Sequence, residues 1–346
     1  MDYPFPCQPR RVDLKAYTVY HQRLAGPTSD MPETGCWPLS HRAGMILPFQ
    51  TFASHVAFHR DEASRRPLAA RYTIMDSGID TARHWEGIAD RWTRTGYNNP
   101  VLANHKRAVY LDLIERWIEA TPRHVLKTDL FAEALTDEEF FSALPWRESI
   151  LGIDVSQGIV SRARKAVTAR GEASRGWVAC DVRSLPFGSC TFDLVVSDST
   201  LDHLATTQEI EGALSELARI LSPGGTMVLT IDNPHNITYP PLWLVRLWMR
   251  LGLAPYFIGA TLNRGQIAAA LARFGLRIDE ETAILHYPHP DGVVRATESM
   301  LRRLGRGRLD RPIQHTFTRL ERLQHSRIRY RTGRYLAIKA TKAGTV

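Results

Sequence analysis

Short apolar runs alternate with helical segments through the middle of the chain, and this alternation constrains the fold more than any other feature. The runs are HVLKT (124–128), SILGIDV (149–155), GWVACD (176–181), FDLVVSD (192–198) and TMVLTID (226–232). Near-continuous apolar runs are typical of strands that are buried on both faces of a parallel sheet. Because helical patterns separate them, the sequence predicts an α/β fold with a doubly wound, mostly parallel sheet.

Helix signals stand between and after these strands. Ser156 occupies the N-cap position of a helix, and apolar residues at helical spacing predict a second helix over 208–221. Asn263 caps a third helix further along the chain. Two more strands are predicted downstream of the central region, at 276–287 and 334–342.

Three regions do not follow this alternation. Residues 1–75 are interrupted by prolines and show no lasting periodicity, which predicts an irregular, disordered leader that the core can lose. Residues 236–262 form an aromatic and apolar insert, which is predicted to be a lid, a helix packed on the core or a helix at a membrane surface. Residues 293–333 form an arginine-rich insert before the last strand.

The charge of the chain is concentrated in that arginine-rich region. Between Arg295 and Arg334 there are twelve arginines and three acidic residues, a net charge of +9, whereas the whole chain carries +8. Such a segment is either a solvated helical face or a contact for an anionic membrane or an acidic carrier protein. No nucleic-acid-binding motif accompanies it, so we do not expect nucleic acid as a partner.

Cysteine usage and hydropathy limit the class of protein further. The four cysteines form no CxxC pair and belong to no His-rich cluster, so no metal site is expected. The first residues, MDYPFPCQPRR, lack the apolar run of a secretory signal, and no stretch reaches the ~20 apolar residues that span a bilayer. These features predict a cytoplasmic protein without a metal.

Acidic residues end two of the predicted strands. Asp154 follows SILGI, and Asp181 follows GWVAC. Ligands of open parallel sheets bind beyond the carboxyl ends of the strands, where a carboxylate can accept both hydroxyl groups of a ribose. A second carboxylate on the next strand can accept the amino group of an adenine. We therefore expect a nucleoside at Asp154 and Asp181, the alternative for each being an acid that stabilises a helix N-terminus.

Three blocks of the sequence resemble the class I S-adenosylmethionine-dependent methyltransferases. They are ILGIDVSQGIVSRAR, CDVRSLPFGSCTFDLVVSDSTLDHL and ELARILSPGGTMVLTIDNP. The resemblance implies a seven-stranded sheet with an antiparallel last strand, in a methyltransferase domain over 76–342 with its core at 122–235. It also implies S-adenosylmethionine as the cofactor, with methyl transfer as the activity.

The resemblance assigns cofactor contacts at the ends of the strands. It implies that Asp154 holds the ribose and that Asp181 and its neighbour Val182 hold the adenine. Val155 is the last residue of the predicted strand 149–155, and Ser197 lies near the end of the predicted strand 192–198. These two residues complete the expected cofactor contacts.

The first loop departs from the family pattern. Members usually carry an acid and then GxGxG after the first strand, whereas this chain has VLKTDLFAEA, with Lys127 for the acid, Asp129 for the first glycine and Phe131 for the second. Loss of the glycines predicts a loop that follows another path. Lys127 and Asp129, two apart on a strand, are expected to project to one side and match the carboxylate and ammonium of the cofactor. The alternative is a local ion pair.

Candidates for the chemistry lie after the fourth and fifth strands. Asp202 and His203 follow the fourth strand, and His203 is either a base that deprotonates the acceptor or a packing residue. His235, Tyr239 and Trp243 follow the fifth strand and are candidates for acceptor contact. The sequence therefore predicts a methyltransferase for a small-molecule or lipid-like acceptor. The alternatives are a non-catalytic cofactor-binding protein and a nucleic-acid modifying methyltransferase.

Overall fold

The computed structural model describes most of the predicted core. The described residues are 81–91, 100–136, 140–171, 174–239, 241, 243–244, 247, 259–287 and 310–344. The predicted leader, most of the aromatic insert and the first half of the arginine-rich insert lie outside them. Within the described residues, no helix has the length and apolar character needed to cross a membrane.

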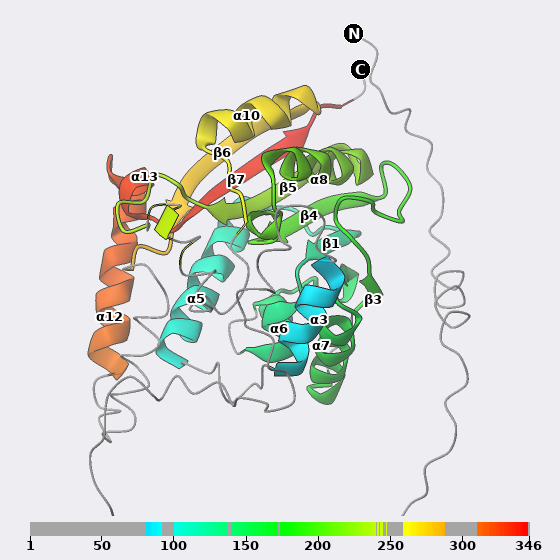
Figure 1. Cartoon of the computed structure of the whole chain (residues 1–346), viewed down its shortest axis with the longest axis horizontal. Helices are drawn as coiled ribbons and strands as arrows, with labels where there is room; N and C mark the ends of the chain where they lie inside the picture. The colour runs from blue at the N-terminus through cyan, green and yellow to red at the C-terminus, as the bar shows by residue number, and fades with distance from the viewer. Residues whose placement is uncertain are drawn as a thin grey trace, which may run out of the picture. The chain divides into compact units, whose positions relative to one another are not determined.

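A seven-stranded sheet in the order β3-β2-β1-β4-β5-β7-β6 forms the centre of the fold (Figure 1). Its strands are β1 (Val125–Thr128), β2 (Ile150–Asp154), β3 (Gly176–Ala179), β4 (Phe192–Asp198), β5 (Leu221–Asp232), β6 (Leu276–Ile284) and β7 (Tyr335–Lys342). The first five strands pair in parallel, and β7 pairs antiparallel with both β5 and β6. The predicted α/β class and the antiparallel last strand are confirmed.

The strand register brings the predicted site segments to one edge of the sheet. Thr128, the last residue of β1, lies opposite Ile153 of β2 and Ser197 of β4. The strand order reverses at β1, because the chain places β2 and β3 on one side of it and β4 and β5 on the other. Such a reversal opens a crevice beyond the strand ends.

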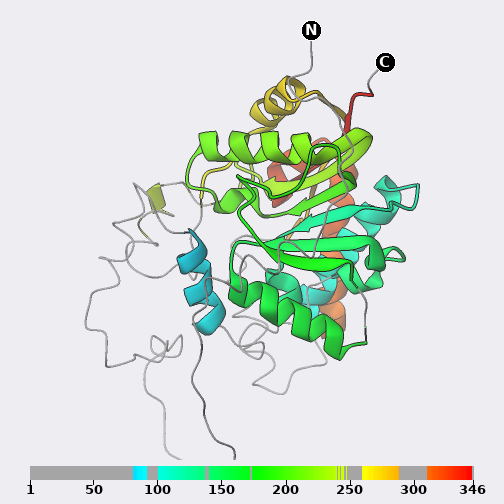
Figure 2. The ribbon, with the colours of Figure 1, turned by 90° about the vertical axis from the view of Figure 1, so that its right-hand side faces the viewer.

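Helices cover both faces of the sheet. They are α3 (Thr81–Arg91), α5 (Pro100–Trp117), α6 (Phe131–Leu135), α7 (Gln157–Ala169), α8 (Thr207–Ile220), α10 (Arg264–Arg273), α12 (Asp310–Glu321) and α13 (Arg329–Thr332). Figure 2 shows α7 and α8 in front of the sheet and α12 behind it. Buried residues of α5 and α12 form one core cluster with the sheet, and those of α3, α6 and α7 form a second.

Side-chain caps fix where the predicted helices begin. Ser156 accepts a hydrogen bond from the backbone N–H of Ile159, and Asn263 forms a reciprocal capping box with Gln266. One boundary differs from the sequence prediction, because β5 begins at Leu221 and not after the Pro-Gly-Gly turn. Gly224 has a positive φ of 75°, which lets the strand absorb an irregularity in its pairing with β4.

Candidate active site

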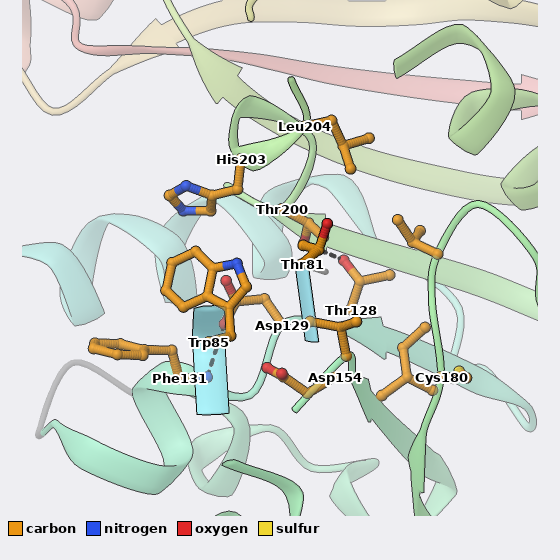
Figure 3. A pocket seen from close by; sticks show the side chains of 13 residues that line it. Thr81, Trp85, Thr128, Asp129, Phe131, Asp154, Cys180, Thr200, His203 and Leu204 are labelled. Carbon is orange, nitrogen blue, oxygen red and sulfur yellow. Dashed lines mark hydrogen bonds between the residues drawn. The ribbon is translucent and has the colours of Figure 1, made fainter. Parts of the chain in front are cut away.

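A pocket opens at the carboxyl ends of β1, β2 and β4 (Figure 3). Thr128, Asp129 and Asp154 line it from the strand ends, and His203 lines it from the turn after β4. The remaining lining residues are Thr81, Trp85, Phe131, Ile153, Val155, Cys180, Val182, Thr200 and Leu204. The pocket therefore lies at the crevice that the strand order predicts.

Asp154 is positioned by backbone donors on either side of it. Its Oδ2 accepts from the N–H of Leu130 at 3.0 Å, and its Oδ1 accepts from the N–H of Ser156 at 2.8 Å. Burial, and then the neighbouring Asp129 carboxylate, raise the pKa of Asp154 to about 7. A carboxylate oxygen has more than one lone pair, so both oxygens can still accept from hydroxyl groups in the pocket.

Asp129 keeps the backbone shape that a glycine would have at its position. Its φ is +64°, in the left-handed region, which Asp tolerates better than most side chains. The carboxylate stabilises the turn because Oδ1 accepts from the N–H of Phe131 at 2.7 Å. Burial raises the pKa of this carboxyl group, although the positive charge of Lys127 opposes the rise. The loss of glycine therefore has not removed the left-handed turn.

This conformation predicts a difference between two substitutions at one position. Asp129→Gly and Asp129→Ala both remove the buried carboxylate, but only alanine keeps a Cβ that clashes at positive φ. We expect Asp129→Ala to be less stable than Asp129→Gly by about 1 kcal/mol, measured by chemical denaturation. Equal stability of the two variants would show that the loop does not hold the left-handed conformation in solution.

Lys127 lies beneath the pocket and does not line it. Its side chain is 3% exposed, and Nζ donates to the backbone oxygen of Asp129 at 2.6 Å. Its ion-pair partner is Glu133 of α6, whose side chain is fully buried and whose Oε1 lies 3.1 Å from Nζ. Asp129 lies one residue beyond the end of β1 in a left-handed conformation, so strand alternation does not fix the direction of its side chain relative to that of Lys127. Contact between Lys127 and a cofactor stays a prediction.

The end of β3 presents side chains of two kinds. Val182 and the half-buried Cys180 line the pocket. Asp181 does not line the pocket. Its carboxylate is hydrogen-bonded to Arg183, whose Nε and Nη2 lie 3.0 and 2.6 Å from Oδ2. Burial alone would raise the pKa of Asp181, but the Arg183 hydrogen bonds lower it below the ordinary value. Adenine contact at Asp181 stays a prediction, and any such contact would share the carboxylate with Arg183.

Helix α3 covers the pocket with residues that the sequence did not single out. Trp85 contacts His203 edge-on at 4.8 Å between ring centroids and Phe131 at 6.2 Å, as Figure 3 shows. Glu86 fastens the helix to the start of α7, where its Oε2 accepts from Ser156 Oγ at 2.6 Å and from the N–H of Gly158 at 3.0 Å. The sequence HWEGIADRW has a helical pattern, but such a pattern does not say where in the fold the helix lies.

The two predicted catalytic residues, Asp202 and His203, differ in burial. His203 faces the pocket, whereas Asp202 is 4% exposed and accepts from Ser199 Oγ at 2.8 Å. His203 lies within electrostatic range of Asp129 in the loop after β1 and of Asp232 at the end of β5. The geometry places His203 where the two sides of the site meet.

The remaining predicted residues do not line this pocket. Ser197 is fully buried in β4, where its Oγ accepts from Thr128 Oγ1 at 3.1 Å. Tyr239 donates its hydroxyl to Asp232 Oδ2 at 3.4 Å, and burial raises the pKa of Asp232 to about 6. His235 lines a second cavity beyond β5, and Trp243 is 67% exposed. Their contact with an acceptor stays a prediction.

Comparison with known proteins gives a family match within the core and longer matches to individual relatives. Residues 128–229 match the methyltransferase domain family. A protein of Encephalitozoon cuniculi, whose name places it among the methyltransferases, is 38% identical over 24% of this chain and 36% of its own length. The malonyl-[acyl-carrier protein] O-methyltransferase of Enterobacter lignolyticus is 27% identical over 52% of this chain and 67% of its own length.

Solved structures resemble this chain at lower sequence identity than the curated relatives do. The methyltransferase in complex with the Haloferax volcanii Trm112 activator has a TM-score of 0.49 at 17% identity, over 77% of this chain and 99% of that chain. The chain spans between about a third and a half of the length of the first curated relatives that it matches. Residues 128–229 thus match a methyltransferase domain, and the sheet around them has the strand order of the class I methyltransferase fold.

Proposed function

We propose that this chain transfers a methyl group from S-adenosylmethionine to a small-molecule or lipid-like acceptor. The observation that carries the proposal is the pocket at the reversal of strand order, with Asp154 at its floor and His203 at its rim. A pocket in this position of an open parallel sheet suits a nucleoside-containing ligand.

The residues of the pocket match the parts of this cofactor. Asp154 can accept from the ribose hydroxyls, and Val155, Val182 and Cys180 supply apolar surface for the adenine. The carboxylates of Asp129 and Asp154 give the pocket a negative character that suits a ligand with a sulfonium and an ammonium group. S-adenosylmethionine would supply the electrophilic methyl carbon, and the side chains position it.

The acceptor is proposed to enter from the side of β5. A nucleophilic atom of the acceptor would form a bond to the methyl carbon as the bond from that carbon to sulfur breaks. We propose that the His203 imidazole takes the acceptor proton where one must leave, with Asp202 behind it as a positioning residue. His235, Tyr239 and Trp243 are proposed acceptor contacts on that side.

The arginine-rich part of the chain is a proposed contact for an anionic partner. An acidic carrier protein is one proposal, and the similarity to an enzyme named for an acyl-carrier-protein substrate is consistent with it. An anionic membrane surface is the other. Of this region, only residues 310–334 are among those that the structure describes.

Asp154→Ala tests the cofactor assignment directly. We expect the variant to bind S-adenosylmethionine about 1–3 kcal/mol more weakly in calorimetry, because charge-assisted hydrogen bonds to the ribose are lost. The variant should lose the same binding free energy for adenosine, which has no amino-acid half. The ionised carboxylate is the better acceptor, and its pKa is about 7. Adenosine affinity of the wild type should therefore fall about tenfold between pH 8 and pH 6.

Three results would separate the alternatives. Affinity in Asp154→Ala that equals the wild type, or no pH dependence in the wild type, would exclude the ribose assignment. Wild-type protein that binds S-adenosylmethionine but moves no labelled methyl group into a crude metabolite pool would favour the non-catalytic protein. Labelling of RNA with salt-sensitive binding would favour the nucleic-acid modifier.

A further inference from the structure

A second cavity lies where the turn after β5, the start of α10 and the helix α13 meet. His235 and Ile237 line it from the turn, Arg264 from α10, and Tyr330 and Arg331 from α13. These segments are far apart in the sequence, so the fold and not local sequence brings the cationic side chains together. Of the residues proposed above for the acceptor, His235 lines this cavity, and none of the proposed cofactor contacts does.

Arg264 is held in a fixed orientation. Its guanidinium stacks on the ring of Tyr330, with Cζ 3.8 Å from the ring centroid, and it forms an ion pair with Glu281 of β6. Tyr330 also donates its hydroxyl to Glu281 Oε1 at 3.3 Å. Arg329 lies 4.8 Å from the same ring and donates to the Tyr330 hydroxyl at 3.2 Å. A cation held in this way loses little conformational entropy when it binds a ligand.

Arg331 supplies a charge that is open to solvent. Arg331 is exposed, and its guanidinium has no ion-pair or hydrogen-bond partner among the residues that the structure describes. Its backbone is fixed, since its carbonyl accepts from the N–H of Ile237 and its own N–H donates to Ile328, both at 2.8 Å. Two arginines thus line the cavity, and only one of them, Arg264, is paired with a glutamate.

Apolar side chains stand next to these cations. Ile237 is 73% exposed and Ile328 is 49% exposed, which is unusual for residues of their size. Both are hydrogen-bonded through the backbone to Arg331, so they are adjacent to its charge. The combination suits a ligand that has an anionic head and an apolar body.

We propose that this cavity binds a phosphate group carried on an apolar molecule, with Arg331 and Arg264 as its ligands. The open guanidinium of Arg331 and the N–H groups of Arg264 that do not face Glu281 can donate to the oxygens of a phosphate. That the phosphate belongs to the methyl acceptor rests on the proposed function. The phosphate could be on a soluble amphiphile or on a lipid headgroup, and the chemistry at the cavity is the same.

Hexyl phosphate tests the site in the full-length protein, with hexanol as the uncharged probe. We expect hexyl phosphate to bind the wild type and Arg331→Ala at least about tenfold more weakly, because a charge-assisted hydrogen bond is removed. Arg327→Ala is the matched control, since Arg327 is an exposed arginine four residues earlier that does not line the cavity. Binding of S-adenosylmethionine should be equal in all three proteins, which separates this test from that of the proposed function.

Vesicles distinguish the two sources of phosphate. If hexyl phosphate fails to bind but vesicles of phosphatidylglycerol bind with the same dependence on Arg331 and not Arg327, the cavity takes a lipid headgroup. Phosphatidylcholine vesicles should bind weakly in either case. Equal losses in Arg331→Ala and Arg327→Ala would overturn the proposal in favour of a diffuse positive surface, and so would the absence of binding to both phosphate probes.

Discussion

Lys127→Ala is expected to destabilise the protein by about 3–5 kcal/mol, because it leaves the fully buried Glu133 carboxylate without its cation. Burial disfavours the charged amine, but the neighbouring carboxylates, Glu133 first, raise the pKa of Lys127 above its ordinary value. The lysine is therefore charged at neutral pH, and its removal exposes the full cost of the buried acid. Chemical denaturation measures the loss.

Two control variants show whether the loss of stability comes from the buried ion pair. Arg116→Ala removes an exposed pair with Asp112, at 2.8 Å, and should cost less than about 1 kcal/mol. The double variant Lys127→Met/Glu133→Leu replaces both charges with apolar groups and should regain most of the stability. A loss in Lys127→Ala no larger than that in Arg116→Ala would mean that the buried pair is not formed.

The double variant also tests the remaining hypothesis about the cofactor. If Lys127 only supports the loop, the double variant binds S-adenosylmethionine and adenosine with the same ratio of affinities as the wild type. If Lys127 holds the amino-acid half of the cofactor, S-adenosylmethionine weakens more than adenosine. The single variant could not separate these results, because its lower stability would affect both ligands.

Patterns that are local in sequence predicted the fold well. The polar end of SILGIDV placed Asp154 and Val155 at the pocket, since the carboxyl ends of parallel strands must meet at one edge. Ser156 and Asn263 were identified as helix caps because their side chains act on the backbone within three residues. Such features depend on spacing that can be read directly from the sequence.

The parts that were missed depend on contacts between distant segments or on the backbone conformation just past the end of β1. Trp85 covers the pocket from a helix more than forty residues upstream of Asp129, and its spacing gave no sign of this. Strand alternation could not predict how the Lys127 and Asp129 side chains lie, because Asp129 is one residue past the end of β1. The left-handed turn at Asp129 was also missed, since the absence of glycine was taken to mean another path.

His203→Asn is expected to slow methyl transfer into a crude metabolite pool by about a hundredfold or more, because asparagine keeps a polar group but cannot take a proton. His203 lines the pocket and contacts Trp85, so its side chain is held at the edge of the cofactor site. Binding of S-adenosylmethionine should change little, which makes the loss one of rate. The dependence of the rate on pH should also change shape.

His124→Asn is the matched control for this substitution. His124 is half-exposed before β1, at the opposite edge of the sheet, and lies 3.5 Å from Asp193. The same chemical change there should leave transfer at the wild-type rate. A His203→Asn variant that keeps more than half of the wild-type rate would assign His203 to packing against Trp85. In that case either the acceptor releases its proton to solvent or the acceptor atom has no proton. Asp202 would then have no role in positioning a base.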